Sequence, residues 1–424
     1  MHNARELLEH GEATRASLAR RGFELDLAEL SAADARRREV LKELEAKRAR
    51  SKVVSEAFGR SKGTDTAAQE EGKVLKADIK TLEEAQRVAE AELEALVLRI
   101  PNLPDERAPE GLEESAKREI RRWGEPPRLD FKPKDHVDLG EGLGILDMGR
   151  AAKISGARFS VLLGQGAALE RAVVSFLIDR HVAAGYLEVS APHLVSRQTM
   201  TGTGQLPKFE PELFATSLSD GSEMFLIPTA EVPVTNLHAQ EILRAEDLPI
   251  AYCAYTSCFR REAGSYGTQT RGLIRQHEFK KVELVRFDTP ERSWDAVDKI
   301  LAQAESVLQE LGLHYRVVEL AAGDLGFAAS FCYDIEVWLP GMNEFREISS
   351  CSNFKQFQAR RAGIRYRAAG GKPDFVATAN GSGLPLGRTL VAILEQNQRS
   401  DGSVAVPKAL QPYLRAEEFR PKTR

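Results

Sequence analysis

A basic, glycine-containing stretch in the middle of the chain carries residue types that could bind a charged, planar ligand. It runs from Phe259 to Leu284 and reads FRREAGSYGTQTRGLIRQHEFKKVEL. In an extended chain, side chains two positions apart lie on the same face. Arg260 and Glu262 are therefore expected to point the same way before the loop Ala263–Gly272. After the loop, the same spacing predicts a second shared face, formed by Arg275, His277, Phe279, Lys281 and Glu283.

This second face suits one particular kind of ligand. A cation, an aromatic ring and a carboxylate along one surface could hold a phosphate, a flat base and an amine in a row. A salt-bridged surface strand would show the same residue types. The stretch alone leaves both interpretations open.

The composition of the whole chain limits the classes of protein to which it can belong. Its 424 residues exceed one typical core, which favours two domains. The net charge of −4 means that any nucleic-acid contact must come from local basic patches. No segment is apolar enough to span a bilayer, and the N-terminus lacks the apolar core of a signal peptide. We therefore expect a soluble, cytoplasmic protein without a membrane partner.

The cysteines indicate the redox compartment and the kind of metal site that is excluded. No two of them show the CxxC spacing of a zinc site, and together they fit a reduced cytoplasm. The sequence therefore predicts no structural zinc. The four residues are Cys253, Cys258, Cys332 and Cys351.

Two long helices must lie near the N-terminus. Apolar or small residues recur at three-four spacing from Leu30 to Phe58 and again from Leu75 to Ile100, which is the periodicity of amphipathic helices. The turn-forming segment GRSKGTDT separates the two runs, and the prolines of IPNLPDERAP end the second. The pattern predicts an antiparallel coiled-coil hairpin.

This hairpin is rich in cations, among them Arg48, Arg50 and Lys52. Charged helix faces are usually solvated, so the hairpin could be a spacer. The same cations could instead lie along the backbone of an RNA. Both interpretations remain open at this stage.

Beyond the prolines the pattern changes to strands that alternate with helices. Residues 167–184 and 388–398 read as helices. Strand-like, turn-bounded runs occupy residues 185–195, 225–234, 251–262, 273–287, 333–350 and 374–383. Consecutive strands with short turns predict an antiparallel sheet flanked by helices, hence an α+β domain. Neither a P-loop nor a GxGxxG motif is present.

Several ordered motifs resemble those of class II aminoacyl-tRNA synthetases of the seryl type. The opening stretch resembles motif 2, GYLEVSAP resembles motif 1, and NGSGLPLGRTLVAILE resembles motif 3. The segments PTAEVPVTNLH, TGTGQLPKF and FREISSCSNFKQFQARR resemble further seryl-type segments, and the hairpin resembles that family's N-terminal arm. The resemblance spans essentially the whole chain. It implies a coiled-coil arm over residues 1–110 and a class II catalytic domain over residues 111–424.

The resemblance implies an ATP site. Arg260 would hold the α-phosphate and form the catalytic pair with Arg388, Glu262 would accept a hydrogen bond from adenine, and Phe279 would stack on it. Arg275 and Arg388 would hold the outer phosphates. The expected ATP-binding set is Arg260, Glu262, Arg275, Phe279, Glu347, Ile348, Ser349, Ser350 and Arg388.

A magnesium ion and a serine pocket are implied in the same way. Glu347 and Ser350 would ligate Mg²⁺ with oxygen donors. Glu283 and Ser382 could pair with the hydroxyl of serine, and the carboxylates suit its ammonium group. The expected serine-binding set is Thr229, Glu231, Glu283, Asn380 and Ser382.

The implied activity is that of a serine–tRNA ligase. ATP would activate L-serine to seryl-adenylate, and the seryl group would pass to tRNA(Ser), with selenocysteine tRNA as a further substrate left open. Arg48, Arg50 and Lys52 would contact the tRNA, and motif 1 implies a homodimer. Two alternatives are a relative that loads a non-tRNA acceptor and a non-catalytic RNA-binding paralogue. The intact arm opposes the first, and Arg260, Glu347 and Arg388 oppose the second.

The sequence departs from the usual family wording in two places. Thr268 and Gln269 stand where the family commonly has another residue followed by aspartate, in the loop expected to touch the acceptor end. Glu278 stands where glutamine is common, on the strand face opposite Phe279. Acceptor handling is therefore the function that the first change puts in doubt.

Overall fold

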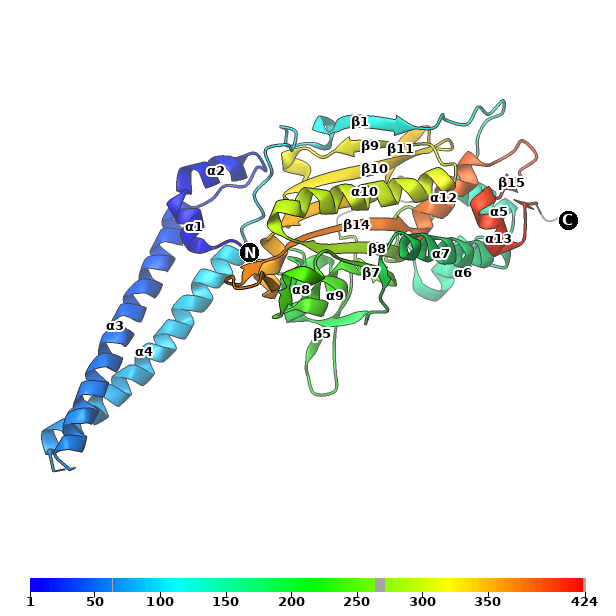
Figure 1. Cartoon of the computed structure of the whole chain (residues 1–424). Coiled ribbons are helices and arrows are strands. Elements are labelled where there is room, and N and C mark those ends of the chain that lie inside the picture. The colour runs from blue at the N-terminus through cyan, green and yellow to red at the C-terminus, as the bar shows by residue number, and fades with distance from the viewer. Residues whose placement is uncertain (63, 264–270, 422–424) are drawn as a thin grey trace. The chain divides into compact units, whose positions relative to one another are not determined.

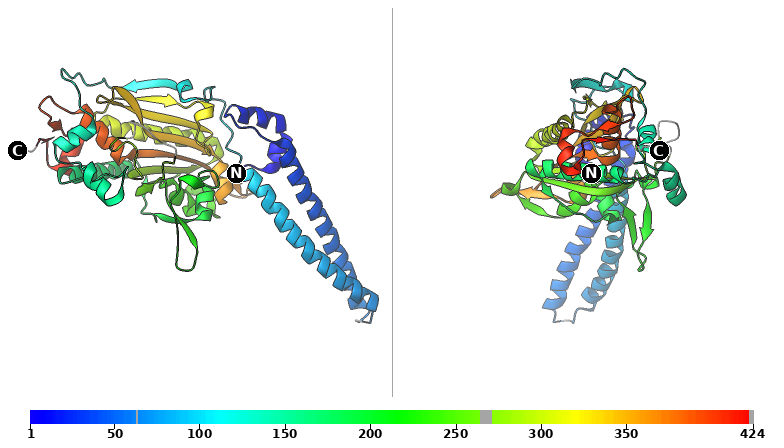
Figure 2. Two further views of the ribbon diagram at one scale, coloured as in Figure 1. Left: turned by 180° about the vertical axis from the view of Figure 1, so that it is seen from behind. Right: turned by 90° about the vertical axis from the view of Figure 1, so that its right-hand side faces the viewer.

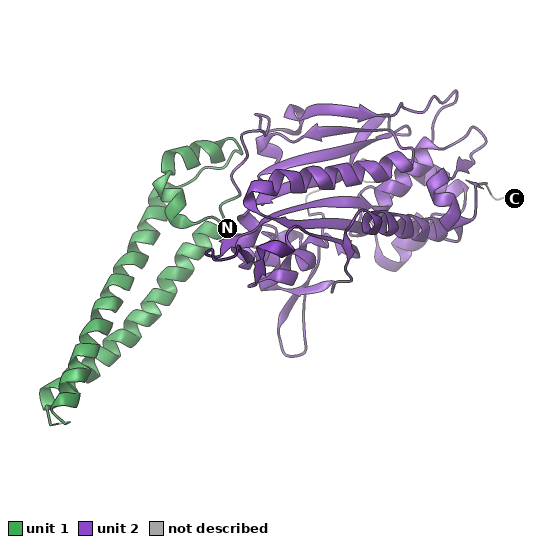
Figure 3. Ribbon diagram, viewed as in Figure 1, with its two compact units in different colours: residues 1–101 green, residues 102–424 purple. Residues whose placement is uncertain are grey.

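The computed structural model describes residues 1–62, 64–263 and 271–421. The chain divides into two compact units, Met1–Pro101 and Asn102–Arg424 (Figure 3). None of the described helices is both long and apolar enough to cross a membrane.

The first unit is built on two long helices, α3 (Leu27–Arg60) and α4 (Thr66–Leu98), which lie side by side (Figure 1). Side-chain caps start both of them. Asp26 accepts from the backbone N–H of Glu29, and Asp65 accepts from that of Ala68, each at 2.9 Å. The predicted helical hairpin is confirmed. Helix α4 begins before the predicted Leu75, because the cap at Asp65 sets its start and the apolar periodicity does not.

The hairpin packs through a narrow apolar seam. The buried apolar residues of α3 and α4 are Leu30, Ala33, Leu44, Val54, Leu75, Ala89, Leu93 and Val97. Two short helices, α1 (Ala4–Glu9) and α2 (Gly11–Ala19), precede the hairpin and bury Leu7 and Leu18. Unit Met1–Pro101 therefore has an apolar core of its own.

The second unit is organised by one large sheet. Its strands follow the order β1-β9-β10-β11-β14-β8-β7-β2, and every neighbouring pair is antiparallel except β2 with β7. The strands are β1 (Arg118–Trp123), β2 (Leu187–Glu188), β7 (Ile250–Phe259), β8 (Glu278–Asp288), β9 (Tyr315–Glu319), β10 (Phe331–Leu339), β11 (Glu344–Lys355) and β14 (Ala377–Pro385).

Long helices cover one face of this sheet. Helices α7 (Gln165–Ala183), α10 (Ser293–Glu310) and α12 (Leu386–Gln396) bury their apolar sides against the strands in one continuous core. Helix α10 lies in front of the strands in Figure 1, and the strands lie in front of it in the reverse view of Figure 2. The predicted α+β fold is confirmed.

Smaller elements complete the unit. Two three-stranded sheets have the orders β3-β5-β4 and β13-β12-β6, and two further apolar clusters support them. The remaining elements are α5 (His136–Gly142), α6 (Met148–Ser155), β3 (Leu194–Ser196), α8 (Arg197–Gly202), β4 (Ala215–Ser217), β5 (Glu223–Leu226), α9 (Glu231–Thr235), β6 (Ile242–Arg244), α11 (Phe357–Ala362), β12 (Arg365–Arg367), β13 (Asp374–Phe375), β15 (Val404–Ala405), α13 (Gln411–Leu414) and β16 (Glu418–Phe419).

Three predicted strands were wrong in part. Residues 225–234 were expected to be extended, but Glu231–Thr235 form α9. The helix tolerates Pro233 because this residue lies in the first turn, where a backbone N–H would have no partner within the helix. The run 185–195 is strand only at Leu187–Glu188 and Leu194–Ser196. Strand β8 begins at Glu278, five residues after the predicted Leu273.

Candidate active site

A cavity of about 510 Å³ lies in the second unit. It is lined by residues of β8, β11 and β14, of the first turns of α9 and α12, and of connecting segments such as 203–213 and 326–329. Its size is within the range of small-molecule sites. The structure brings into its lining almost every expected ATP and serine residue: Thr229, Glu231, Arg260, Glu262, Arg275, Phe279, Glu283, Glu347, Ile348, Ser350, Asn380, Ser382 and Arg388.

Two expected residues do not line it. Ser349 is fully buried, and its hydroxyl donates to the carbonyl of Ser382 at 2.7 Å. His277 was expected to share a face with Phe279, but it precedes β8, so strand alternation does not apply to it. Its ring packs near Phe159, with 5.5 Å between ring centroids. The prediction for His277 was wrong.

At one side of the cavity a cation lies next to an aromatic ring. The guanidinium carbon of Arg260 is 5.1 Å from the ring centre of Phe279, and Arg260 Nε donates to the carbonyl of Pro228 at 3.2 Å. None of the described acidic side chains forms an ion pair with Arg260. Its charge is therefore left for an anionic ligand.

Glu262 and Arg275 meet across the loop. Arg275 Nη1 lies 3.2 Å from Glu262 Oε2. The backbone of Glu262 is left-handed, with φ +48°, a conformation that is uncommon for non-glycine residues. Arg158 Nη1 donates to the carbonyl of Glu262 at 3.0 Å and supports this conformation.

Arg388 joins three segments at the start of α12. Its Nη1 donates to the carbonyl of Glu347 at 2.6 Å and lies 3.4 Å from the Glu347 carboxylate. Its Nε donates to the carbonyl of Ile274 at 3.3 Å. Arg388 thereby links α12, β11 and the segment that precedes β8.

The acidic end of the cavity is formed by Glu283, which is almost fully buried. Thr229 Oγ1 donates to Glu283 Oε2 at 2.7 Å, and Lys281 forms an ion pair with the same oxygen. The hydroxyl of Ser382 is buried nearby in the lining and has no hydrogen-bond partner among the described residues. Buried polar atoms are nearly always paired, so this hydroxyl is available to a ligand.

Glu231 lies beside Glu283 at the first residue of α9. Burial, and then the neighbouring Glu283 carboxylate, raise the pKa of Glu231 to about 7. The amide of Gln358 donates to Glu231 Oε1 at 2.5 Å, and Asn380 also bonds to this carboxylate. A bound cation would relieve the repulsion between the two carboxylates.

Three lining or supporting residues were not expected from the sequence. Lys281 was placed on the correct face but given no role. Thr203 lines the cavity with a second buried, unpartnered hydroxyl among the described residues, and Gln358 supports Glu231. Thr203 lies in the segment TGTGQLPKF and Gln358 in the segment FREISSCSNFKQFQARR. The resemblance of these two segments to seryl-type sequences was the signal that could have identified both residues.

In the helical unit, two of the expected RNA-binding cations are tied to acidic residues of α4. Arg48 pairs with Glu83 at 2.8 Å, and Arg50 pairs with Glu71 through two hydrogen bonds of 2.6 and 2.9 Å. Lys52 is exposed. The first two cations therefore also hold the hairpin together.

The departures from the family wording fall in two places. Thr268 and Gln269 lie outside the described residues. Glu278 is exposed at the start of β8 and does not line the cavity.

Two family models and several known proteins match the chain. Residues 1–104 match the family "Seryl-tRNA synthetase N-terminal domain", and residues 214–397 match "tRNA synthetase class II core domain (G, H, P, S and T)". The serine–tRNA ligase of Geobacter sulfurreducens is 53% identical over 418 residues, which cover 98% of each chain.

Two solved structures are similar over nearly their full length. Seryl-tRNA synthetase from Pyrococcus horikoshii, complexed with ATP, matches with a TM-score of 0.90 and 34% identity over 100% of both chains. The cytoplasmic serine–tRNA ligase of Naegleria fowleri, in complex with AMP, matches with a TM-score of 0.85 and 29% identity, covering 97% of this chain and 96% of the other.

Proposed function

The chain belongs to the seryl-tRNA synthetase family of class II aminoacyl-tRNA synthetases. We propose the following roles for its residues in the serine–tRNA ligase reaction. Its substrates are serine, ATP and tRNA. The observation that best supports these roles is that one cavity contains both Arg260, which pairs with no described carboxylate, and two adjoining buried carboxylates, Glu231 and Glu283. These are an anion site beside an ammonium site.

ATP occupies the arginine side of the cavity. Phe279 stacks on adenine, Glu262 accepts from its amino group, and Arg275 and Arg388 bind the outer phosphates. Arg260 binds the α-phosphate, where negative charge builds up as the serine carboxylate attacks in line. No described side chain is placed as an essential general base, so positioning and charge neutralisation carry the rate.

Serine occupies the acidic side. Glu231 and Asn380 bind the ammonium group, while Glu283, Thr229 and Ser382 surround the side-chain hydroxyl. Lys281 compensates part of the charge of Glu283. Alanine in this pocket would leave buried polar atoms unpaired, a large energetic cost that serine avoids.

Magnesium is the metal that fits Glu347 and Ser350. Mg²⁺ in nucleotide sites takes one or two carboxylates and otherwise phosphates and water, and this donor set is one carboxylate and one hydroxyl. Burial, and then the nearby Glu347 carboxylate, hold the pKa of Asp334, beside this donor set, well above its usual range. When bound, the ion neutralises phosphate charge.

The helical unit binds the RNA. Residues 1–110 form the tRNA-binding arm and residues 111–424 the catalytic domain. Arg48, Arg50 and Lys52 contact the backbone of tRNA(Ser) through their cations. A homodimer formed through motif 1 and a cytoplasmic location complete the proposal, and the charging of selenocysteine tRNA is an extension of the same reaction.

Amino-acid-dependent ATP–pyrophosphate exchange tests the activation step. Serine is expected to drive exchange with kcat/KM at least about a thousandfold above that of alanine, because alanine leaves Glu283 and Ser382 without their hydroxyl partner. Glycine and threonine serve as further comparisons for the lack of a hydroxyl and for pocket size. Exchange with alanine at a rate close to that with serine would contradict the pocket assignment.

The pH dependence of the serine KM tests the role of Glu231. Because the pKa of Glu231 is raised to about 7, its carboxyl is mostly protonated at pH 6 and ionised at pH 8. Only the ionised form attracts an ammonium group, so the serine KM should fall as the pH rises through about 7. The measurement is exchange at saturating ATP, and Glu231→Gln should remove the pH dependence. A serine KM that does not change between pH 6 and pH 8 would contradict this role.

A further inference from the structure

The contacts of Gln358 deepen the proposed function and rest on it. We propose that Gln358 is a positioning residue that holds the Glu231 carboxylate for the ammonium group of serine, and that Thr378 fixes the Gln358 amide in the required orientation. Gln358 lies in α11, remote in the sequence from Glu231, and only 1% of it is exposed.

The surroundings allow only one orientation of this amide. Gln358 Nε2 lies 2.5 Å from Glu231 Oε1 and 3.3 Å from the carbonyl of Thr203. A backbone carbonyl and an ionised carboxylate can accept hydrogen bonds but cannot donate them. The NH₂ group of Gln358 must therefore face both Glu231 and the Thr203 carbonyl. Thr378 Oγ1 donates to Gln358 Oε1 at 2.8 Å on the opposite side. Every polar atom of the amide is thereby used.

This arrangement favours the ionised form of Glu231 and leaves lone pairs free. Gln358 and Asn380 both bond to the Glu231 carboxylate, which has about four lone-pair sites, so acceptor capacity remains for a ligand ammonium. The charged groups that face Glu231 are Glu283 and Lys281, both from β8. Glu283 opposes ionisation of Glu231, and the hydrogen bond from Gln358 favours it. Loss of Gln358 should therefore weaken the attraction for serine without changing the ATP side.

The test uses the near-isosteric substitution Gln358→Met in the full chain. In pyrophosphate exchange at pH 7 we expect the serine KM to rise about tenfold, the value of one hydrogen bond to a charged group, with the ATP KM within about twofold. The pH at which the serine KM improves should move upward. Thr378→Val should show part of the effect, and Thr378→Ser, which keeps the hydroxyl, should not.

Two outcomes would overturn this inference. One is an equal rise of both KM values in Gln358→Met, and the other is an unshifted pH profile. Serine-dependent exchange by the unaltered chain tests the proposed function itself. A failure of the inference is therefore distinguishable from a failure of the function.

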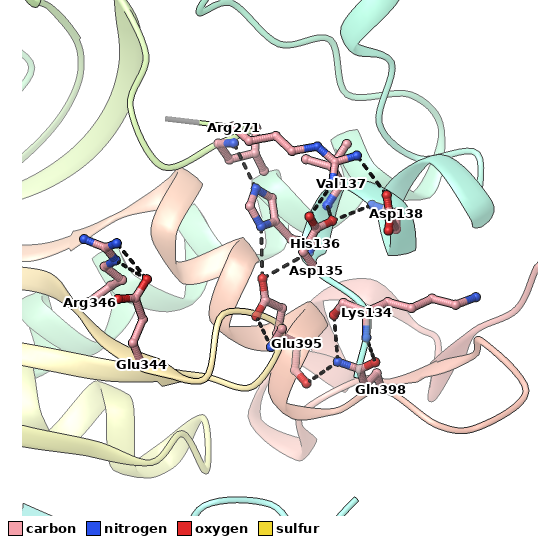
Figure 4. A network of polar contacts seen from close by, with 12 residues as sticks. Lys134, Asp135, His136, Val137, Asp138, Arg271, Glu344, Arg346, Glu395 and Gln398 are labelled. Atoms are coloured by element: carbon pink, nitrogen blue, oxygen red, sulfur yellow. Dashed lines mark hydrogen bonds and ion pairs between the residues drawn. The ribbon is translucent and has the colours of Figure 1, made fainter. Parts of the chain in front are cut away.

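A separate network, around His136, carries a second inference (Figure 4). The carboxylate of Glu395, in α12, is fully buried and lies 3.0 Å from both the backbone nitrogen and the Nδ1 of His136. The backbone N–H of Gly341 donates to its other oxygen at 2.9 Å. On the far side of the imidazole, the N–H of Leu273 donates to Nε2 at 3.2 Å. The tautomer is therefore the neutral one with hydrogen on Nδ1.

The network holds the segment that leads into the ATP side of the cavity. Leu273 and Ile274 line the cavity, and Arg388 from the same helix α12 donates to the Ile274 carbonyl. Gly272, with φ +72°, lies so close that a Cβ there would be 2.2 Å from His136 Nε2. The geometry points to His136 as a positioning residue that fixes Leu273–Arg275 relative to α12. It thereby places Arg275 and Arg388 correctly for binding ATP.

His136→Phe keeps a ring and removes both hydrogen bonds, whereas His136→Gln can still accept from Leu273. We expect the ATP KM to rise about tenfold in His136→Phe, because a buried N–H is left unpaired, and to recover in part in His136→Gln. The serine KM should stay within about twofold in both. Parallel changes in the two KM values, or no recovery in a folded His136→Gln, would overturn the inference. Gln358→Met is the matched control, because it is expected to raise the serine KM and to leave the ATP KM nearly unchanged.

Discussion

Replacing Arg260 or Arg388 by alanine is expected to lower serine-dependent pyrophosphate exchange by about two orders of magnitude or more, because each change removes a phosphate contact that strengthens in the transition state. Arg260 forms no ion pair with any described acidic side chain, so its substitution should cost activity and little stability. Arg388 also holds the carbonyls of Glu347 and Ile274. Its loss should disturb the metal side as well and give the larger effect.

Arg261 supplies the matched control for this experiment. It is exposed, adjacent to Arg260 and absent from the cavity lining. Arg261→Ala should leave exchange close to that of the unaltered chain. The comparison needs kcat and the ATP KM for each variant together with a thermal melt. Near-normal exchange by a well-folded Arg260→Ala protein would refute the ATP assignment.

Removal of the helical unit should separate activation from transfer. Because α1 and α2 bury their apolar residues within the same unit as α3 and α4, the cleanest cut deletes residues 1–101 as a whole. Every proposed activation residue lies in Asn102–Arg424, so serine-dependent exchange should persist. Aminoacylation of tRNA should fall by about two orders of magnitude or more, because the loss of several phosphate contacts removes most of the binding.

Point variants of the hairpin test whether its cations make these contacts. Lys52→Glu should weaken tRNA binding and its salt dependence. Arg48→Glu alone would also break the ion pair with Glu83, so it should be combined with Glu83→Arg, which keeps the pair and moves the cation to α4. If the shortened chain charged tRNA as well as the intact one, the hairpin would be a spacer and a non-tRNA acceptor would become the favoured alternative.

Much of the architecture follows from patterns that are local in the sequence. Three-four spacing predicted α3 and α4, because a helix buries residues that recur at its own period. Alternation correctly placed Phe279, Lys281 and Glu283 on one face of β8, because strand side chains alternate. The resemblance of the motifs to a known family predicted the arginines and carboxylates that line the cavity. These predictions need only neighbours along the chain.

The tertiary structure alone decided which of these residues meet, and how. Alternation failed at His277, which precedes the strand, and an extended reading failed at Glu231, which begins a helix. The partners of Glu231 and of Leu273 are Gln358 and His136, which lie 127 and 137 residues away in the chain. No periodicity encodes such pairs, because their contact depends on how the sheet brings distant segments together. The electrostatics of the site depend on the same packing, since the pKa of Glu231 is raised first by burial and then by Glu283.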